Sequence, residues 1–254
     1  MPDVSNHPIK NRSAKTYPMK THTASQFATL DQLDAAMRGR LVVSCQPVDD
    51  GPLDVDNVVP LLAKAAQIGG AGAIRIEGAN RVRLTRAAID VPIIGIIKRD
   101  LSDSPVRITP YLADVETLAD AGAYIIAVDA TDRTRPATVS ALLAAIKARG
   151  LWAMADCANL GDATRAHEMG FTIVGTTLSG YTGGVIPDEP DYTFLAALAK
   201  VAPRVMAEGR FNTPEQVARA AALGAWAVAV GTAITRTEVL TSWFAQAMKA
   251  PLEK

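Results

Sequence analysis

Polar residues end several short apolar runs of this 254-residue chain. Lys98 closes the run Pro92–Lys98, and Glu208 closes the run Arg204–Glu208. A lysine amine and a carboxyl group that approach one carbon atom from opposite sides can remove a proton from it and return one to its other face. Other runs contain or end in Gln46, Arg75, Asp129 and Asp156, and Thr232 directly follows the last run. We therefore predict acid–base chemistry where these runs end.

This chemistry requires shifted pKa values in both groups. Burial and the positive charge of Arg75 are expected to lower the pKa of Lys98, so that its amine is neutral part of the time. Glu208 needs a raised pKa in order to hold the proton that it donates.

Two structural alternatives remain open for the same pair. In one, Lys98 forms a buried ion pair with Asp129 or Asp156. In the other, Glu208 forms an ion pair with the nearby Arg210. In either case the residue would serve the fold and would not be available to a substrate.

Two turns that contain glycine follow the last two apolar runs. Gly209 and Arg210 form the first turn, Gly231 and Thr232 form the second, and Arg236 lies shortly beyond. Glycine lets a phosphate approach backbone N–H groups closely, and an arginine adds a charge-assisted hydrogen bond. We predict that these residues bind a phosphate group; the alternative is that each glycine serves only a tight turn.

The segment from Leu178 to Pro187 contains three glycines and Tyr181. A glycine-rich segment that follows a strand can close over a site, so Tyr181 is predicted to contact the substrate. The alternative is a flexible surface loop with no role.

The apolar runs are strand candidates because they are short, rich in β-branched residues and separated by amphipathic stretches. They are Leu41–Gln46, Ala73–Glu77, Pro92–Lys98, Tyr124–Ala130, Leu151–Cys157, Phe171–Thr177, Arg204–Glu208 and Trp226–Gly231. Helices are predicted at Asn57–Ile68, Ala113–Ala121, Thr138–Arg149, Asp162–Met169, Asp191–Val201 and Thr213–Leu223. Eight such units in series favour an α/β fold, a single closed (β/α)8 or TIM barrel, over a doubly wound sheet.

One barrel domain is predicted over residues 25–254. Residues 1–24 have no hydrophobic period and are expected to form a mobile leader. A helix from Ser25 to Arg38 is predicted before the first strand, with Ser25 as its cap. The second unit leaves room for only a brief helix between Gly78 and Ile89. In such a barrel the active site lies at the C-terminal ends of the strands.

Composition excludes several classes of protein. Hydrophobic residues make up 49% of the chain, enough for a large core, and 26 Lys and Arg residues balance 26 Asp and Glu residues. This balance argues against a nucleic-acid surface or a membrane anchor, and no apolar run reaches the roughly 20 residues that span a bilayer. We expect a cytoplasmic protein with a small-molecule partner. Cys45, Cys157 and the three histidines lack metal-ligand spacing, so no metal is expected.

Taken together, the motifs resemble those of the N-acylmannosamine-6-phosphate 2-epimerase family. The resemblance covers about Leu41 to Arg236 and is specific because eight strand ends match in chain order. Its motifs are Ser44-Cys-Gln-Pro47, Ala73-Ile-Arg-Ile-Glu-Gly78, Pro92-Ile-Ile-Gly-Ile-Ile-Lys98, Val128-Asp-Ala-Thr131, Met154-Ala-Asp156, Thr176-Thr-Leu-Ser-Gly-Tyr-Thr182, Ala207-Glu-Gly-Arg210 and Gly231-Thr-Ala-Ile-Thr-Arg236.

The resemblance implies conversion of N-acetylmannosamine 6-phosphate to N-acetylglucosamine 6-phosphate, a step in sialic acid breakdown, without a metal or cofactor. It also implies that Lys98 takes the proton at C2 of the sugar and that Glu208 delivers one to the opposite face. The other positions that it implies are substrate contacts at Gln46, Arg75 and Asp156, a position near the site at Asp129, and a phosphate contact at Arg236.

Two rival hypotheses use the same residues. A barrel lyase would form a Schiff base between Lys98 and a sugar carbonyl, and a degenerate barrel would bind a sugar phosphate without turnover. For assembly, the apolar residues near the C-terminus predict a homodimer, the alternative being that they pack on the chain's own barrel. These residues are Val239, Leu240, Trp243, Phe244 and Met248.

Overall fold

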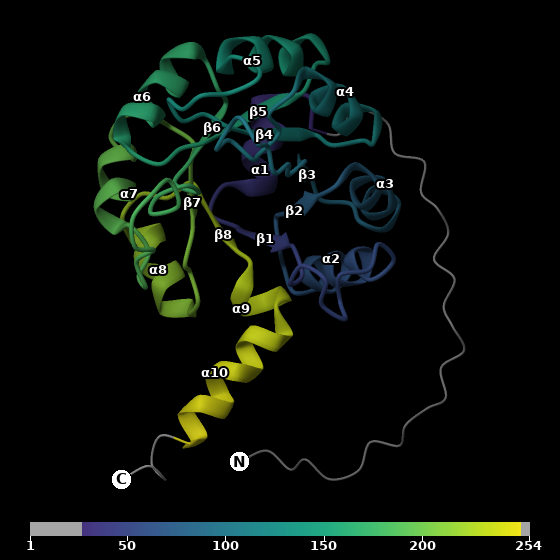
Figure 1. The fold of residues 1–254 in the computed structure, drawn as a ribbon, viewed down its shortest axis with the longest axis vertical. Helices are drawn as coiled ribbons and strands as arrows, with labels where there is room; N and C mark the ends of the chain where they lie inside the picture. The colour runs from purple at the N-terminus through teal and green to yellow at the C-terminus, as the bar shows by residue number, and fades with distance from the viewer. Residues whose placement is uncertain (1–26, 250–254) are drawn as a thin grey trace.

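The structure, a computed structural model, describes residues 27–249 and contains a closed barrel of eight parallel strands (Figure 1). The strands are β1 (Leu41–Cys45), β2 (Ala73–Glu77), β3 (Ile93–Ile96), β4 (Ile125–Asp129), β5 (Trp152–Asp156), β6 (Ile173–Gly175), β7 (Val205–Glu208) and β8 (Ala227–Val230). Pairing of β1 with β8, with Val42 beside Ala229, closes the barrel. The predicted (β/α)8 barrel is confirmed.

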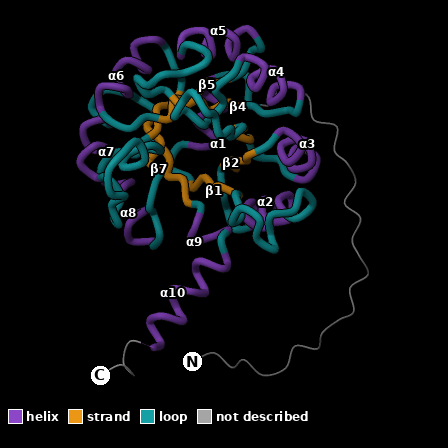
Figure 2. The backbone as a smooth tube through the Cα atoms, viewed as in Figure 1, coloured by secondary structure: helices purple, strands orange, loops and turns teal. Residues whose placement is uncertain are grey.

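Helices form a ring outside the strands (Figure 2). They are α2 (Val59–Ile68), α3 (Ala79–Ala88), α4 (Leu112–Asp120), α5 (Val139–Ala148), α6 (Leu160–Met169), α7 (Tyr192–Leu198) and α8 (Pro214–Ala222). Side chains alternate along each strand. In β3, Ile94 and Ile96 belong to the cluster inside the barrel, whereas Ile93 packs in the cluster beneath the helices. A residue in step with Ile94 and Ile96 therefore points into the barrel.

The N-terminal helix α1 (Leu30–Met37) begins later than expected. Thr29 caps it: the Thr29 hydroxyl accepts from the Gln32 amide at 3.2 Å, and the Gln32 side chain accepts from the Thr29 amide at 3.1 Å. This reciprocal pair satisfies backbone groups at the helix start, so Thr29 and not Ser25 marks it. Ser25 and the predicted leader at residues 1–24 lie outside the described residues.

The second unit also differs from the prediction. Helix α3 has 10 residues, as many as α2, and is not brief. Gly78 serves as its N-cap with φ of 89°, a conformation that favours glycine, so the helix starts directly after β2 without a connecting loop.

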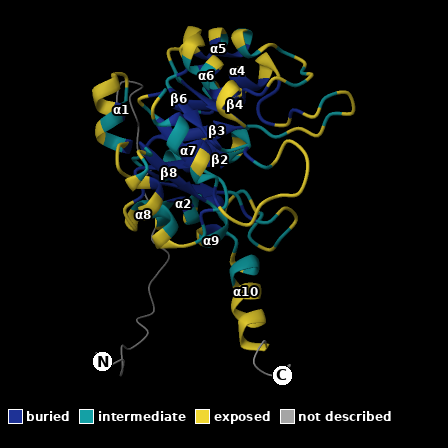
Figure 3. Ribbon diagram, turned by 90° about the vertical axis from the view of Figure 1, so that its left-hand side faces the viewer, coloured by how far each residue is buried: buried dark blue, intermediate teal, exposed yellow. Residues whose placement is uncertain are grey.

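The C-terminal part consists of α9 (Thr232–Thr235) and α10 (Thr237–Lys249), and α10 projects away from the barrel (Figures 1 and 3). None of its residues is buried, and the side chains of Phe244 and Met248 are 72% and 75% exposed. In the part of the chain that the structure describes, no helix has the length and apolar character needed to cross a membrane.

Candidate active site

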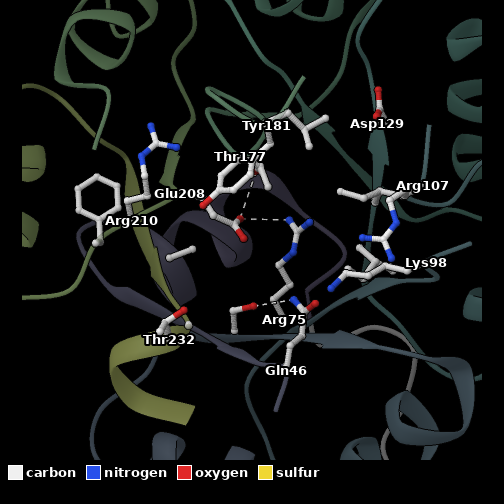
Figure 4. A pocket seen from close by; sticks show the side chains of 18 of the residues that line it. Gln46, Arg75, Lys98, Arg107, Asp129, Thr177, Tyr181, Glu208, Arg210 and Thr232 are labelled. Carbon is white, nitrogen blue, oxygen red and sulfur yellow. Dashed lines mark hydrogen bonds and ion pairs between the residues drawn. The ribbon is translucent and has the colours of Figure 1, made fainter. Parts of the chain in front are cut away.

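A cavity of about 410 Å³ opens at the C-terminal ends of the strands (Figure 4). The inward alternation of the strands explains which side chains line it. Lys98 continues the inward positions Ile94 and Ile96, and Glu208 continues the inward position of Met206. The cavity lies where a barrel of this kind places its active site.

Arg75 occupies the floor of the cavity and is 1% exposed. Its guanidinium binds the Asp156 carboxylate through two contacts, Nη2 to Oδ2 at 2.7 Å and Nη1 to Oδ1 at 3.1 Å. Its Nη1 also donates to Oε2 of Glu208 at 3.1 Å. Glu208 is therefore paired with Arg75, and the alternative that it pairs with Arg210 is wrong.

Glu208 is further held by Thr177. The Thr177 hydroxyl lies 2.6 Å from Oδ1 of Asp156 and 3.3 Å from Oε2 of Glu208. Burial raises the pKa of Glu208, although Arg75 acts in the opposite direction, and the negative charge of Asp156 adds to the increase. The direction is the one that a proton donor needs at neutral pH.

Lys98 approaches the cavity from the segment that follows β3, where it forms an isolated bridge with Ile108. Burial lowers the pKa of its amine, and the positive charge of Arg75 lowers it further, against the opposing effect of Asp49 and Glu77. This agrees with the direction and the causes expected from the sequence.

The proposed ion pair of Lys98 with Asp129 or Asp156 is also wrong. Asp156 is taken by Arg75, while Oδ2 of Asp129 binds Arg133 at 2.6 Å and Oδ1 binds Arg135 at 3.1 Å. Within residues 27–249, neither carboxylate pairs with Lys98. Its amine and the Glu208 carboxylate lie on opposite sides of the Arg75 guanidinium (Figure 4).

The two predicted aspartates lie at different depths. Asp129 lines the edge of the cavity, but its carboxylate is held by arginines and by the Thr131 hydroxyl at 2.6 Å. Asp156 is fully buried beneath Arg75 and does not line the cavity. In this structure both aspartates orient other side chains.

The remaining predicted substrate contacts line the cavity. The amide of Gln46 donates to the Ser44 hydroxyl at 2.7 Å, and the ring of Tyr181, 45% exposed, forms part of the outer wall. Arg236 lines the cavity too, and its Nε donates to the backbone carbonyl of Gln46 at 3.1 Å. Gln46 and Arg236 are thus fixed to one another.

The predicted phosphate-binding residues all border the cavity: Gly209, Arg210, Gly231, Thr232 and Arg236. Arg210 differs from the others because its guanidinium donates to the backbone carbonyls of Ser179 and Glu189, at 2.5 and 2.7 Å. Its side chain therefore binds a neighbouring segment of the chain.

Three residues that sequence analysis missed also belong to this site: Thr177, Arg107 and Arg133. Thr177 is in step with the inward position Ile173 of β6, so strand alternation could have found it. Arg107 lies in a loop after β3 and not at a strand end, so no sequence signal marks it. Its loop returns to the cavity through the antiparallel bridge between Lys98 and Ile108.

The cavity is lined by more positively charged than negatively charged side chains. Arg75, Lys98, Arg107, Arg133, Arg210 and Arg236 line it, against the carboxylates of Asp129 and Glu208. This excess of positive charge suits an anionic ligand. Among the described residues, no group of His, Cys, Asp or Glu side chains is arranged to hold a metal ion.

A closed (β/α)8 barrel with an opposed amine and carboxyl group in a cationic mouth defines an enzyme of the barrel class that acts on a small anionic compound. The family model "Putative N-acetylmannosamine-6-phosphate epimerase" matches residues 59–250. The chain belongs to this family of epimerases.

Individual relatives agree with the family match. Two proteins named "Putative N-acetylmannosamine-6-phosphate 2-epimerase" come from Proteus mirabilis and Escherichia coli O157:H7, and they are 54% and 55% identical to this chain. The alignments cover 85% and 89% of this chain and 93% and 98% of the relatives. The solved N-acetylmannosamine-6-phosphate 2-epimerase of Clostridium perfringens is 40% identical, with a TM-score of 0.82, over 85% of this chain and 96% of that one.

Proposed function

We propose that this enzyme converts N-acylmannosamine 6-phosphate to N-acylglucosamine 6-phosphate by moving a proton at C2, a step of sialic acid catabolism. The observation that carries the proposal is the position of Lys98 and Glu208, which enter one cavity from opposite sides of Arg75. Two groups on opposite faces of a carbon can invert its configuration, because one removes a proton from one face and the other adds a proton to the opposite face. The family match supports the substrate.

The reaction begins with the open-chain sugar, because its C2 proton is acidic only beside the C1 aldehyde. Lys98, as the neutral amine, removes the proton from C2, and the electron pair of the C–H bond moves into an enolate at C1 and C2. Glu208 then gives its proton to the opposite face of C2, which restores the aldehyde and leaves a Lys98 ammonium and a Glu208 carboxylate. Proton exchange with solvent returns both groups to their starting forms.

Hydrogen-bond donors around the cavity stabilise the developing enolate oxygen. Gln46 uses one N–H of its amide for Ser44, so its second N–H is available for a substrate oxygen. Arg75 contributes its positive charge from the floor, where Asp156 fixes the guanidinium. Asp156 thus acts on the substrate through Arg75.

The phosphate group binds at the mouth between β7 and β8. Arg236 supplies a charge there, and Gly209, Gly231 and Thr232 border the same end of the cavity. Binding at this end, away from C2, orients the sugar and holds its open chain against the acid–base pair.

We also propose a homodimer in which α10 of each copy packs on the barrel of the other. A second cavity, of about 310 Å³, lies where α2, β1 and α9 meet, and it is lined almost entirely by apolar side chains: Leu41, Val43, Leu62, Ala65, Ala66, Gly69, Ala71, Ile234 and Thr235. Among the described helices, α10 alone has no buried residue, although it carries Trp243, Phe244 and Met248. An exposed apolar helix and an apolar groove are complementary.

A proton NMR time course in deuterated water tests the proposed reaction. With N-acetylmannosamine 6-phosphate as substrate, we expect the gluco epimer to appear with deuterium at C2. Unchanged signals, with a ligand-induced shift of the protein spectrum, would instead support the degenerate binder. Cleavage of the carbon chain of the sugar, with a covalent adduct on Lys98 after borohydride treatment, would support the lyase.

A further inference from the structure

Arg210 follows β7 at the rim of the cavity, yet its side chain turns toward the segment that follows β6. Its Nη1 donates to the carbonyl of Ser179 at 2.5 Å, and its Nε donates to the carbonyl of Glu189 at 2.7 Å. Its guanidinium also lies 5.4 Å from the ring centre of Tyr181, a cation–π contact. One side chain thus binds both ends of residues 179–189, which we call the cover segment.

The cover segment is built around this guanidinium. Gly180 has φ of 80°, and a Cβ atom placed on it would lie 2.6 Å from Cδ of Pro187 and 3.2 Å from Nη1 of Arg210. Only a residue without a side chain fits there. The start of the segment, its end and Arg210 therefore pack together at one point.

The backbone of Arg210 is also unusual. Its φ is 63°, in the left-handed region, directly after Gly209 with φ of 111°. A non-glycine residue is strained in this region and persists there when its surroundings determine its conformation. Here the two carbonyl contacts and the Tyr181 ring hold the side chain in place.

We propose that Arg210 is a positioning residue that latches the cover segment, and with it Tyr181, over the cavity. Release of its two carbonyl contacts opens the path by which the sugar phosphate enters and the product leaves. This inference deepens the proposed function and depends on it for the identity of the substrate. A direct phosphate contact, the role expected from the sequence, is the competing assignment for the Arg210 side chain.

The latch and the phosphate contact predict different effects of the substitution Arg210→Lys. Lysine keeps the positive charge that a phosphate needs, but its ammonium is one donor atom on a flexible stem and does not reproduce the fixed geometry in which Nε and Nη1 of arginine each reach a carbonyl. If Arg210 is a latch, Arg210→Lys resembles Arg210→Ala in its effects. If it is a phosphate contact, Arg210→Lys retains most of the substrate affinity that Arg210→Ala loses.

Chymotrypsin cleavage after Tyr181, followed by mass spectrometry in the absence of substrate, reports opening directly. We expect cleavage about tenfold faster in Arg210→Lys and Arg210→Ala than in the unmodified enzyme, because lost hydrogen bonds raise the open population. Both variants should also raise KM by similar factors. Arg219→Ala is the control, because Arg219 stacks on Tyr192 at 3.9 Å and does not line the cavity. Unchanged cleavage in both Arg210 variants would overturn the latch.

Gly180→Ala provides a second variant that leaves the charge of Arg210 intact. It should accelerate cleavage as Arg210→Ala does, because its new methyl group displaces Pro187 and the guanidinium. Gly184→Ala is its matched control: Gly184 also has φ of 80°, but nothing lies within 4 Å of an added Cβ. Equal cleavage rates in Gly180→Ala and Gly184→Ala would contradict the latch. The cleavage assay requires no turnover, so failure of the proposed epimerase reaction would be seen separately.

Discussion

Burial and the residues between Lys98 and Glu208 bring the pKa values of these two groups closer together. Arg75 repels the ammonium form of Lys98 and attracts the carboxylate form of Glu208, while burial disfavours the charged form of both groups. Burial dominates for Glu208, so the pKa values of the two groups converge. An acid and a base with converging pKa values can both be in the required form at one pH.

The pH dependence of kcat/KM should reflect this convergence. The acid limb reports the group with the lower pKa and should lie above 4.5, the ordinary value for Glu208, because the pKa of Glu208 is raised. The alkaline limb should lie below 10.5, the ordinary value for Lys98, because its pKa is lowered. Initial rates measured across this pH range should give a bell-shaped profile of kcat/KM, and its two limbs should lie closer together than the ordinary pKa values of 4.5 and 10.5. Limbs at or outside those values would contradict the assignment.

Substitution of either group should separate exchange at C2 from epimerisation. In Glu208→Gln, Lys98 can still remove and return the proton of the manno isomer, so NMR should show deuterium entering that isomer without a change of configuration. In Lys98→Met, exchange should be confined to the gluco isomer. Both variants should keep the thermal unfolding midpoint close to that of the unmodified enzyme, since both side chains line the cavity at the mouth of the barrel. Epimerisation by either variant would disprove the two-base mechanism.

At the scale of elements, α1 lies at one end of the barrel, while the long loops that follow the strands lie at the other (Figure 3). Asp34 of α1 fixes it there through contacts with Arg204, at 2.9 Å, and with the Trp226 indole, at 2.9 Å. Leu33 and Met37 of the same helix are fully buried against the barrel interior. The helix therefore covers the end of the barrel opposite the cavity.

Asp34→Asn should loosen this contact. Burial raises the pKa of Asp34, but hydrogen bonds from Arg204, Arg38 and Trp226 outweigh it and lower the pKa to about 2. Because the folded-state pKa is depressed, the stabilisation is complete above the ordinary value of 3.8 and is lost as the pH falls through about 2. Urea unfolding at neutral pH should show a loss of about 1–2 kcal/mol in the free energy of unfolding.

The exposed Asp31 on the same helix supplies the control, and Asp31→Asn should change the free energy of unfolding by less than about 0.5 kcal/mol. The difference between Asp34→Asn and the unmodified protein should also shrink as the pH approaches 2. A pH-independent difference would mean that the charge of Asp34 does not fasten α1.

At the scale of the whole molecule, the exposed face of α10 should determine assembly. Sedimentation velocity should show a dimer for the unmodified protein and a monomer for Phe244→Asp, because a charge on this apolar face opposes its burial. Gln246→Asp adds the same charge to the same exposed helix and should leave the dimer intact. A monomeric unmodified protein at micromolar concentration would contradict the proposed assembly.

Much of this molecule was predictable because its pattern is local. Short apolar runs alternate with amphipathic stretches, and polar residues such as Lys98 and Glu208 close the runs. In a closed parallel barrel the ends of all strands meet at one mouth, so the fold alone brings these residues together. The sequence therefore determined the barrel, the family and most of the charged side chains around the cavity.

Only the tertiary structure decided how these side chains are paired. Glu208 contacts Arg75, 133 positions away in the chain, and not Arg210, two residues along. Arg210 instead binds the cover segment, and a loop with no sequence signal brings Arg107 to the cavity. A sequence shows which groups can form ion pairs and hydrogen bonds, but these contacts depend on distances of a few ångströms. Those distances are set only when strands remote in the chain pack side by side.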